Sequence, residues 1–560
     1  MQDLGQKKRI AVLLISLMFL SMVPVIAPLA SADEARDANI QVTVTPNAQT
    51  INPGESGEYT VRVYNSGSNP VTVQLSTAEG QDQDCSAYTS TITQIPGPID
   101  SGSYEEASMN VTLAQNAEGS CETTVTATAQ DQRPDLVVAV NNLPGSLEGI
   151  EEMGNVAVRI TYSMYDSLIR RDFLADGSGQ ASELVPGLAE SWTRIDDRTL
   201  ELKLREGVLF HDGSELTADD VVFSMTSTRG QGQNPLIGSA KRYMDTISHV
   251  IPLDKYTVQV VSKEPDVLLE QRLAGYAFWI VNAKNYLTVG KDAFARNPVA
   301  TGPYKMDEWV EGEYIRLAAH DDYFGGKPTA KSVTFTEVPE MSARIAGLVS
   351  GEYDISVNIS PDQIPTVESY DDLKVEQIVL DNTHMLIFWT VGPLEDKRVR
   401  QALSLSIDRD LLRQALWADK NYTPNGHQLP SYVMYMEDYP TFEYNVEKAK
   451  ALLAEAGYNG EEIVYRFPLN YYLLSTEAAQ AMQQMWSQAG LNVKLEPVEN
   501  WSQVRATDGG HIRPWSNTHR MPDPLGSFVP QWGKLSGIQN NSRLEDRQWD
   551  APAAFNDAQD

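Results

Sequence analysis

Two periodicities of apolar residues divide this chain, and the change between them limits the folds it can adopt. Between Ile40 and Ala129, apolar residues alternate with polar ones, as in the stretch from Tyr59 to Val63. This alternation is typical of half-buried antiparallel strands. From about residue 150 onward, strand patterns and helix patterns interleave, which is typical of α/β folds. The sequence therefore predicts a small all-β domain followed by a larger α/β body.

The all-β part is predicted to be a sandwich over residues 38–130. Turn clusters such as Asn52-Pro53-Gly54 separate its strand patterns. The stretch PGESGEYTVRVYNSG, residues 53–67, resembles the immunoglobulin-like modules of secreted adhesion-type proteins. Two roles stay open for this module. It is either a spacer that holds the next domain away from the cell surface, or a domain that binds a ligand or a cell-surface partner.

The first 32 residues are typical of a secretory signal peptide. Lys7, Lys8 and Arg9 form a positive start, residues 10–20 are apolar, and small residues at 30–32 provide a cleavage position. We therefore expect an exported protein, in the periplasm or at the outer face of the cell membrane. The alternative is an uncleaved anchor, because the apolar stretch 10–29 is nearly long enough to span a bilayer.

The charge balance argues against nucleic acid as a partner. Acidic residues outnumber basic ones by 76 to 44, and the formal net charge is -32. A surface this negative repels phosphate backbones.

The only two cysteines, Cys85 and Cys121, both lie in the predicted sandwich. In an exported chain, a single pair of cysteines predicts one disulfide. The chain has seven histidines, and none lies in a metal-spaced cluster with a cysteine. Neither a metal site nor a cofactor is therefore expected.

A linker is predicted at residues 131–149, because this stretch carries two prolines and few large apolar residues apart from 136–138. Beyond it, several helix boundaries are marked. Thr217 and Asp220 form a pattern close to a capping box at the start of a helix. Gly457 and Gly490 mark the ends of two later helices.

Eight blocks of the α/β body, in the right order, resemble the solute-binding proteins of the oligopeptide, dipeptide and nickel type, family 5, which serve ABC importers. The blocks are LVPGLAESW (184–192), LREGVLFHDG (204–213), LTADDVVFS (216–224), TGPY (301–304), DYFGGKP (322–328), SGEYDI (350–355), RVRQAL with IDR (398–409) and VEKAKALLAEAG (446–457).

The resemblance implies a two-lobed α/β fold of the periplasmic-binding-protein (Venus-flytrap) type, which closes over a ligand. Lobe one is expected over residues 150–375 and lobe two over 376–560. The implied function is capture of a peptide or other small polar solute and its delivery to the permease subunits of an ABC transporter. The alternative is a cell-surface sensor or adhesion protein that reuses the two-lobe fold.

Catalysis is not expected from these residues. The sequence contains no GxSxG, HExxH, Walker or CxxC motif. The loop His211-Asp212-Gly213 could be catalytic by composition, but a turn before a helix is the simpler interpretation, because Gly213 supplies the bend. The family motifs are therefore predicted to determine the fold rather than contact the ligand.

The candidate ligand-binding residues come from the resemblance. Peptide-binding relatives carry an aspartate shortly before an Asp-Pro pair, and this aspartate pairs with the peptide amino group. Here the position falls on Arg520, or on His519 or Met521 with a slip of one residue. A cation there favours a carboxylate or phosphate over an amine. Pairing of Arg520 with an acidic neighbour such as Asp523 stays open.

Tryptophans are the other candidates for the ligand site. Trp389 stands where relatives often have Asn in a Phe-Asn-Thr motif, and it is predicted to form an aromatic wall of the cleft. Packing in the core is the alternative. Trp515 and Trp501 are candidates of the same kind.

The chain ends in a polar stretch, residues 555–560, where relatives continue with elements that return to lobe one. We therefore expect lobe two to be truncated at its C-terminus.

Overall fold

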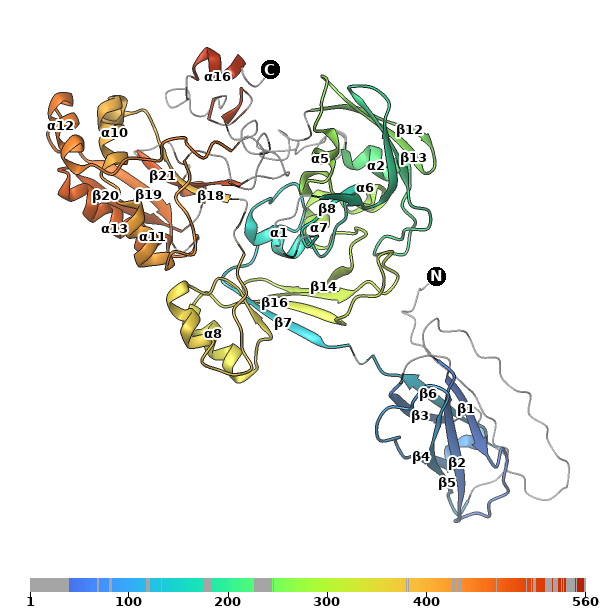
Figure 1. Cartoon of the computed structure of the whole chain (residues 1–560). Helices are drawn as coiled ribbons and strands as arrows, with labels where there is room; N and C mark the ends of the chain where they lie inside the picture. Colours follow the sequence, from blue (N-terminus) through green and yellow to red (C-terminus); the bar gives the residue numbers. More distant parts are fainter. Residues whose placement is uncertain are drawn as a thin grey trace. The chain divides into compact units, whose positions relative to one another are not determined.

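The computed structural model describes residues 40–560 with gaps. The residues left out within this range are 68–69, 80–82, 117–120, 132, 176, 178–182, 226–243, 245, 379, 381, 426–429, 431–434, 470, 500, 505, 507–509, 519–525, 527–531, 535, 537, 540–548, 550 and 558–560. The predicted signal peptide lies outside the described residues. The chain divides into two compact units, Met1–Arg133 and Pro134–Asp560 (Figure 1).

The first unit is a sandwich of two antiparallel sheets. The larger sheet has the order β1-β2-β5-β4 and the smaller pairs β3 with β6. The strands are β1 (Ile40–Thr45), β2 (Ser56–Asn65), β3 (Val73–Glu79), β4 (Tyr88–Ile92), β5 (Tyr104–Leu113) and β6 (Thr123–Ala129), and a short 3-10 helix, Gln83–Ala87, precedes β4. The all-β prediction for this region is confirmed.

Alternation along the strands builds the core of the sandwich. Val61 and Met109 of the larger sheet and Ala127 of the smaller sheet are all fully buried in one apolar cluster. Cys85 and Cys121, whose Cα atoms lie 5.0 Å apart, form a disulfide in this unit and also belong to its core. The predicted disulfide is confirmed.

The predicted linker at residues 131–149 is wrong for most of its length. Residues Asp135–Val140 form strand β7, which lies between β16 (Ser332–Glu337) and β17 (Ile355–Ser356) and runs parallel to both. A strand buried in a parallel sheet is a continuous apolar run rather than an alternating one. The run that begins at Leu136 is such a strand.

Lobe one is built on two larger sheets. The first has the order β14-β15-β16-β7-β17, with β14 (Tyr304–Val310) and β15 (Tyr314–Ala319). The second has the order β10-β11-β13-β12, with β10 (Ala189–Arg194), β11 (Thr199–Leu204), β13 (Thr257–Ser262) and β12 (Ile247–Asp254). A hairpin of β8 (Ile169–Asp172) and β9 (Glu183–Pro186) completes its strands among the described residues.

Short helices surround these sheets. They are α1 (Asn155–Thr161), α2 (Ala218–Met225), α5 (Leu269–Leu273), α6 (Ala283–Val289), α7 (Lys291–Arg296), α8 (Met341–Ser350) and α9 (Ile364–Val367). The capping pattern before α2 is confirmed, because the Thr217 backbone N–H donates to the Asp220 carboxylate at 3.0 Å. Burial raises the pKa of Asp220, which also accepts from the backbone of Ala283 at the start of α6.

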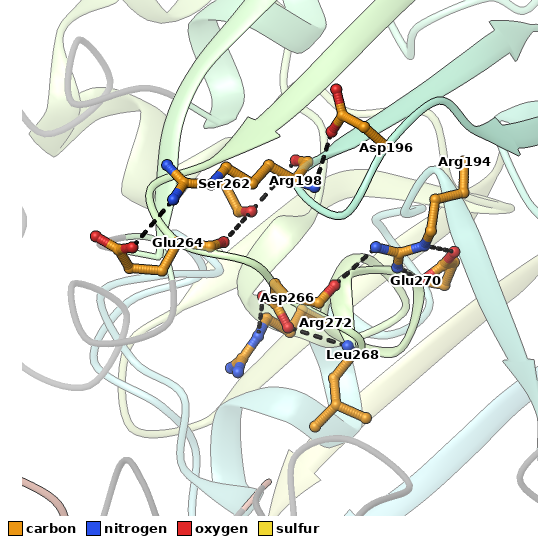
Figure 2. Close-up of polar contacts among 9 residues, drawn as sticks. All are labelled: Arg194, Asp196, Arg198, Ser262, Glu264, Asp266, Leu268, Glu270 and Arg272. Carbon is orange, nitrogen blue, oxygen red and sulfur yellow. Dashed lines mark hydrogen bonds and ion pairs between the residues drawn. The ribbon is translucent and has the colours of Figure 1, made fainter. Parts of the chain in front are cut away.

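Charged side chains fasten one end of the second sheet of lobe one (Figure 2). Arg194 at the end of β10 forms an ion pair with Glu270 of α5 and donates to the backbone carbonyl of Asp266 at 2.8 Å. The Asp266 carboxylate accepts from Arg272 at 2.7 Å, and these two side chains are only 10% and 11% exposed. The network therefore ties α5 to the β10–β11 turn.

Lobe two has one four-stranded sheet, with the order β18-β21-β19-β20. Its strands are β18 (Asn382–Phe388), β21 (Ile512–Thr518), β19 (Ile463–Pro468) and β20 (Val493–Val498). Its helices are α10 (Lys397–Leu405), α11 (Arg409–Trp417), α12 (Val446–Ala456), α13 (Ser475–Gln488), α14 (Trp501–Val504) and α16 (Ala553–Asp557). The lobe boundary predicted at residue 376 falls between β17 and β18 and stays a prediction.

The helix ends predicted in lobe two are confirmed. Gly457 after α12 has φ +70° and Gly490 after α13 has φ +91°, a conformation that glycine adopts without steric cost. Trp486 of α13 is fully buried and donates its indole N–H to the carbonyl of Leu403 at 2.9 Å, so it joins α13 to α10 in a core separate from those of lobe one. Over the described residues, no helix is both long enough and apolar enough to cross a membrane.

Candidate functional site

The candidate site lies where the parallel strands of the lobe-two sheet end. β19 runs parallel to β20 on one side and to β21 on the other. From β19 the chain connects to β20 on one side, and from β20 it connects to β21 on the other side of β19. Successive connections therefore lead to opposite sides of β19. In open α/β sheets, ligands bind outside the carboxyl ends of the strands at such a point.

Aromatic side chains gather in this region. We call His384, Tyr471, Tyr472, Trp501 and Trp515 the aromatic wall. Tyr471 and Tyr472 follow β19, Trp501 follows β20, and the other two lie in the paired strands β18 and β21. The Tyr471 ring lies 5.1 Å from that of Trp501, and the Trp501 ring lies 5.9 Å from that of Trp515, both edge to face.

The wall is half-buried, so its rings are both supported and reachable. The four tyrosine and tryptophan side chains of the wall are partly exposed. Edge-to-face packing fixes the rings, and the Tyr472 hydroxyl donates to Ser516 at 3.3 Å. Ordered aromatic rings of this kind can stack on flat or apolar groups of a ligand.

His384 adds a neutral polar group to the wall. Its ring lies 4.7 Å from that of Tyr472, and the residue is exposed to solvent. The neighbouring side chains lower the pKa of the imidazole below its usual value by partial desolvation. At neutral pH, His384 therefore offers an uncharged donor and acceptor.

Arg513 and Trp389 pack next to the wall. The Arg513 guanidinium lies 4.6 Å from the ring centre of Trp515 and 5.0 Å from that of Trp389. Trp389 is only 7% exposed and packs in an apolar cluster with Ile387 and Ile538. The core-packing alternative thus describes Trp389 in this structure, and its contact with a ligand stays a prediction.

Lobe one approaches the wall at the start of α1. A Cβ atom added to Gly154 would lie 3.5 Å from the hydroxyl oxygen of Tyr471. Arg159, one turn further along α1, is near enough to Tyr471 for the two side chains to interact electrostatically. Groups from both lobes therefore meet at Tyr471.

Comparison with known proteins decides the family. Residues 183–537 match the model of the bacterial extracellular solute-binding proteins, family 5, which covers more than half of the chain. The chain belongs to this family. Members of the family capture solutes outside the cytoplasm for ABC importers, and this solute-binding protein is accordingly an exported receptor of the same kind.

Relatives of this solute-binding protein include two with peptide-binding names. The dipeptide-binding protein of Escherichia coli is 30% identical over 61% of this chain and 69% of the relative. The oligopeptide-binding protein AppA of Bacillus subtilis is 30% identical over 66% of this chain and 70% of the relative. The family consists of binding proteins rather than enzymes.

Solved structures show the same two-lobe fold. The DppA protein of Helicobacter pylori, in complex with the peptide STSA, has a TM-score of 0.67 and 22% identity and covers 76% of this chain and 86% of its own. AppA of Bacillus subtilis, in complex with a nonapeptide, has a TM-score of 0.64 and 25% identity, with coverage of 76% and 86%. The fold-class prediction is confirmed.

The family motifs of this solute-binding protein hold lobe one together. The side chains of His211 and His320 both contact the carbonyl oxygen of Gly302, at 3.1 and 3.2 Å, and their rings lie 5.2 Å apart. Burial, with a smaller effect from His320, lowers the pKa of His211 to about 3. A neutral histidine bonded to a backbone carbonyl supports a turn, as predicted for the His211 loop.

The structure brings only some of the predicted site residues together. Trp515 and Trp501 belong to the aromatic wall. Arg520 and His519 lie outside the described residues, so their roles stay predictions. Tyr471, Tyr472 and His384 were missed by the sequence analysis. The signal of the two tyrosines was positional, because they come three and four residues after the end of β19.

The rest of lobe two contains a separate pocket of about 670 Å³ beside α11, lined by Arg409, Arg413, Phe442 and Tyr444 among others. No residue of the aromatic wall lines this pocket. Across the parts of the chain that the structure describes, no group of three or more His, Cys, Asp or Glu side chains could hold a metal ion.

Proposed function

We propose that this solute-binding protein captures a peptide against the aromatic wall and delivers it to an ABC import permease. The observation that carries the proposal is the wall itself. Its fixed, reachable rings stand at the point where ligands bind in open α/β sheets, and lobe one approaches it at Gly154. The peptide-binding names of the relatives support a peptide over other small polar solutes.

The binding is proposed to use the wall for side-chain or backbone stacking and His384 for a neutral hydrogen bond. A ligand held by contacts to both lobes favours the closed arrangement, because only that arrangement satisfies both sets of contacts. Neither contact requires a bond to be broken, so we propose that the peptide is released unchanged.

The test is retention of peptides by the full-length chain. A pool of tripeptides is incubated with the protein, and retained peptides are identified by mass spectrometry after gel filtration. Trp501→Ala should weaken retention about tenfold or more, because a stacking aromatic group contributes roughly 1–3 kcal/mol to binding. Trp309→Ala is the matched control, since Trp309 lies in β14 of lobe one and stacks on Arg296 at 4.2 Å.

Two outcomes would contradict the proposal. The first is retention that Trp501→Ala leaves unchanged, which would place the peptide elsewhere. The second is recovery of cleaved peptides, which would replace a binding protein with a hydrolase. A cell-surface partner of the sandwich remains a separate prediction, to be tested by binding of the isolated Ile40–Arg133 unit to whole cells.

A further inference from the structure

A second group of polar residues lies at the carboxyl end of β7 in lobe one. β7 runs parallel to β16 and β17, one on each side, so the connections diverge here as they do beside β19. Asn141 follows β7 directly, and Arg159 of α1 contacts its side-chain oxygen at 3.5 Å. The first large sheet of lobe one therefore presents a cation at the position where ligands bind in open α/β sheets.

Arg159 has spare donors at this position. Its Nε donates to the carbonyl of Asn155 at 3.2 Å and its Nη1 to Asn141, which leaves three of the five guanidinium N–H groups without an acceptor among the described residues. It forms no ion pair with any carboxylate among the described residues, although the chain carries 76 acidic residues. The side chain is half-buried, and burial lowers its pKa.

A second arginine increases the positive charge. Arg344 of α8 is only 2% exposed and donates to the carbonyls of Val338 and Pro339 at 2.7 and 2.8 Å. Its buried Nε has no acceptor in the described part of the chain, and no carboxylate there forms an ion pair with it. The acid that most influences it is the exposed Glu340, while its charge also acts on Arg159.

Two arginines that repel each other and form no ion pair with a described carboxylate are costly in a folded protein. Taking a guanidinium out of water is unfavourable unless a counter-charge compensates it, and two like charges increase the cost. A carboxylate bound to Arg159 would remove both penalties, and the planar guanidinium matches a carboxylate with two parallel hydrogen bonds. Tyr471 of the aromatic wall lies close to the same arginine.

We propose that Arg159 and Arg344 form an anion subsite on lobe one, which receives a carboxylate of the captured solute. Arg159 contacts the carboxylate, and the buried Arg344 acts through its charge. This inference rests on the proposed function, because the solute must reach from the aromatic wall to α1. It names the class of substrate: peptides with a free carboxylate, at the C-terminus or on a side chain, rather than amidated neutral peptides.

The experiment compares two tripeptide pools on the full-length chain, one with free C-terminal carboxylates and one with C-terminal amides. Wild-type protein should retain the neutral amides at least tenfold less than the corresponding acids. Selective retention of amides that contain Asp or Glu would locate the recognised carboxylate on a side chain. Arg159→Gln should lose at least tenfold in affinity for the acids and no longer distinguish the two pools, and Arg159→Lys should recover part of the difference.

Arg296→Gln is the matched control. Arg296 also lies in lobe one, is 46% exposed and pairs with Glu311 on the surface, so its replacement should leave both pools unaffected. Thermal unfolding of each variant checks that the fold is retained. Equal retention of acids and amides by wild-type protein, or unchanged retention by a folded Arg159→Gln variant, overturns the anion subsite and leaves the peptide receptor intact. Retention of neither pool counts against both proposals.

Discussion

Single charged residues of lobe one differ in their contribution to stability according to their burial. Asp266 and Arg272 are 10% and 11% exposed, whereas Glu264, which lies two residues before Asp266 and pairs with Arg198, is 84% exposed. A nearly buried carboxylate leaves an uncompensated guanidinium when it is removed, but an exposed one leaves its partner to water. Figure 2 shows both pairs.

Asp266→Ala should therefore lower the free energy of unfolding by about 3 kcal/mol, because it leaves Arg272 buried without its partner. Glu264→Ala, the control two residues away, should change it by less than about 0.5 kcal/mol. Urea denaturation of both variants measures the two values. Equal effects from the two substitutions would show that burial does not set the contribution of these pairs.

The buried His211 should make the folded protein less stable in mild acid. The pKa of histidine is about 6.5 in an unfolded chain, and burial lowers that of His211 to about 3 in the folded protein. Below pH 6.5, the unfolded state therefore binds a proton at His211, and the folded state does not. The contribution of neutral His211 to the stability of the fold is present above pH 6.5 and is lost as the pH falls toward 3. Between pH 7.5 and 5, the free energy of unfolding should fall by about 1–2 kcal/mol through this residue.

The measurement is urea denaturation across pH 5–7.5. His211→Gln should reduce the dependence of stability on pH, whereas His249→Gln should leave it as in wild type, because His249 is exposed on β12. An unchanged pH dependence in His211→Gln would assign the effect to other groups, of which His320, with its pKa also lowered by burial, is the first to consider.

The secondary-structure elements whose ends are set by nearby residues could be predicted from the sequence. The glycines after α12 and α13 and the capping pair before α2 act locally, so the sequence alone carries the information. β7 was mistaken for a linker because its partners, β16 and β17, are distant in sequence. The aromatic wall was only partly predicted for the same reason, since its members come from four different segments that the sheet order brings together.

The disulfide should stabilise the sandwich and not the lobes. Cys85 and Cys121 are 36 residues apart, and closing a loop of this size is expected to stabilise a fold by about 3–4 kcal/mol. Reductant, or the Cys85→Ser/Cys121→Ser variant, should lower the unfolding temperature of the sandwich while leaving that of the second unit unchanged. Calorimetry of the full chain can resolve the two transitions. Intact-mass analysis after alkylation without reductant should detect no modified thiol.

We expect limited proteolysis to cut the chain first at one place, between the two compact units. The two compact units divide between Arg133 and Pro134. The last strand of the sandwich ends at Ala129, and the first strand of the second unit begins at Asp135. Because hydrogen-bonded strands resist proteases, the first cut should fall between these strands rather than throughout the predicted linker 131–149. N-terminal sequencing of the larger fragment identifies the site. A first cut within β7 would mean that this strand is not stably paired.

The position of β7 also determines the order in which the molecule can assemble. Its Asp135 accepts a hydrogen bond from Ser332 of β16, 197 residues later, whereas the sandwich strands all pair within residues 40–129. A chain that emerges N-terminus first can complete the sandwich early, but β7 must wait for its neighbours, and such distant pairing is slow. Until then, the apolar run from Leu136 to Val140 is exposed to solvent, and we expect a chaperone to bind this segment.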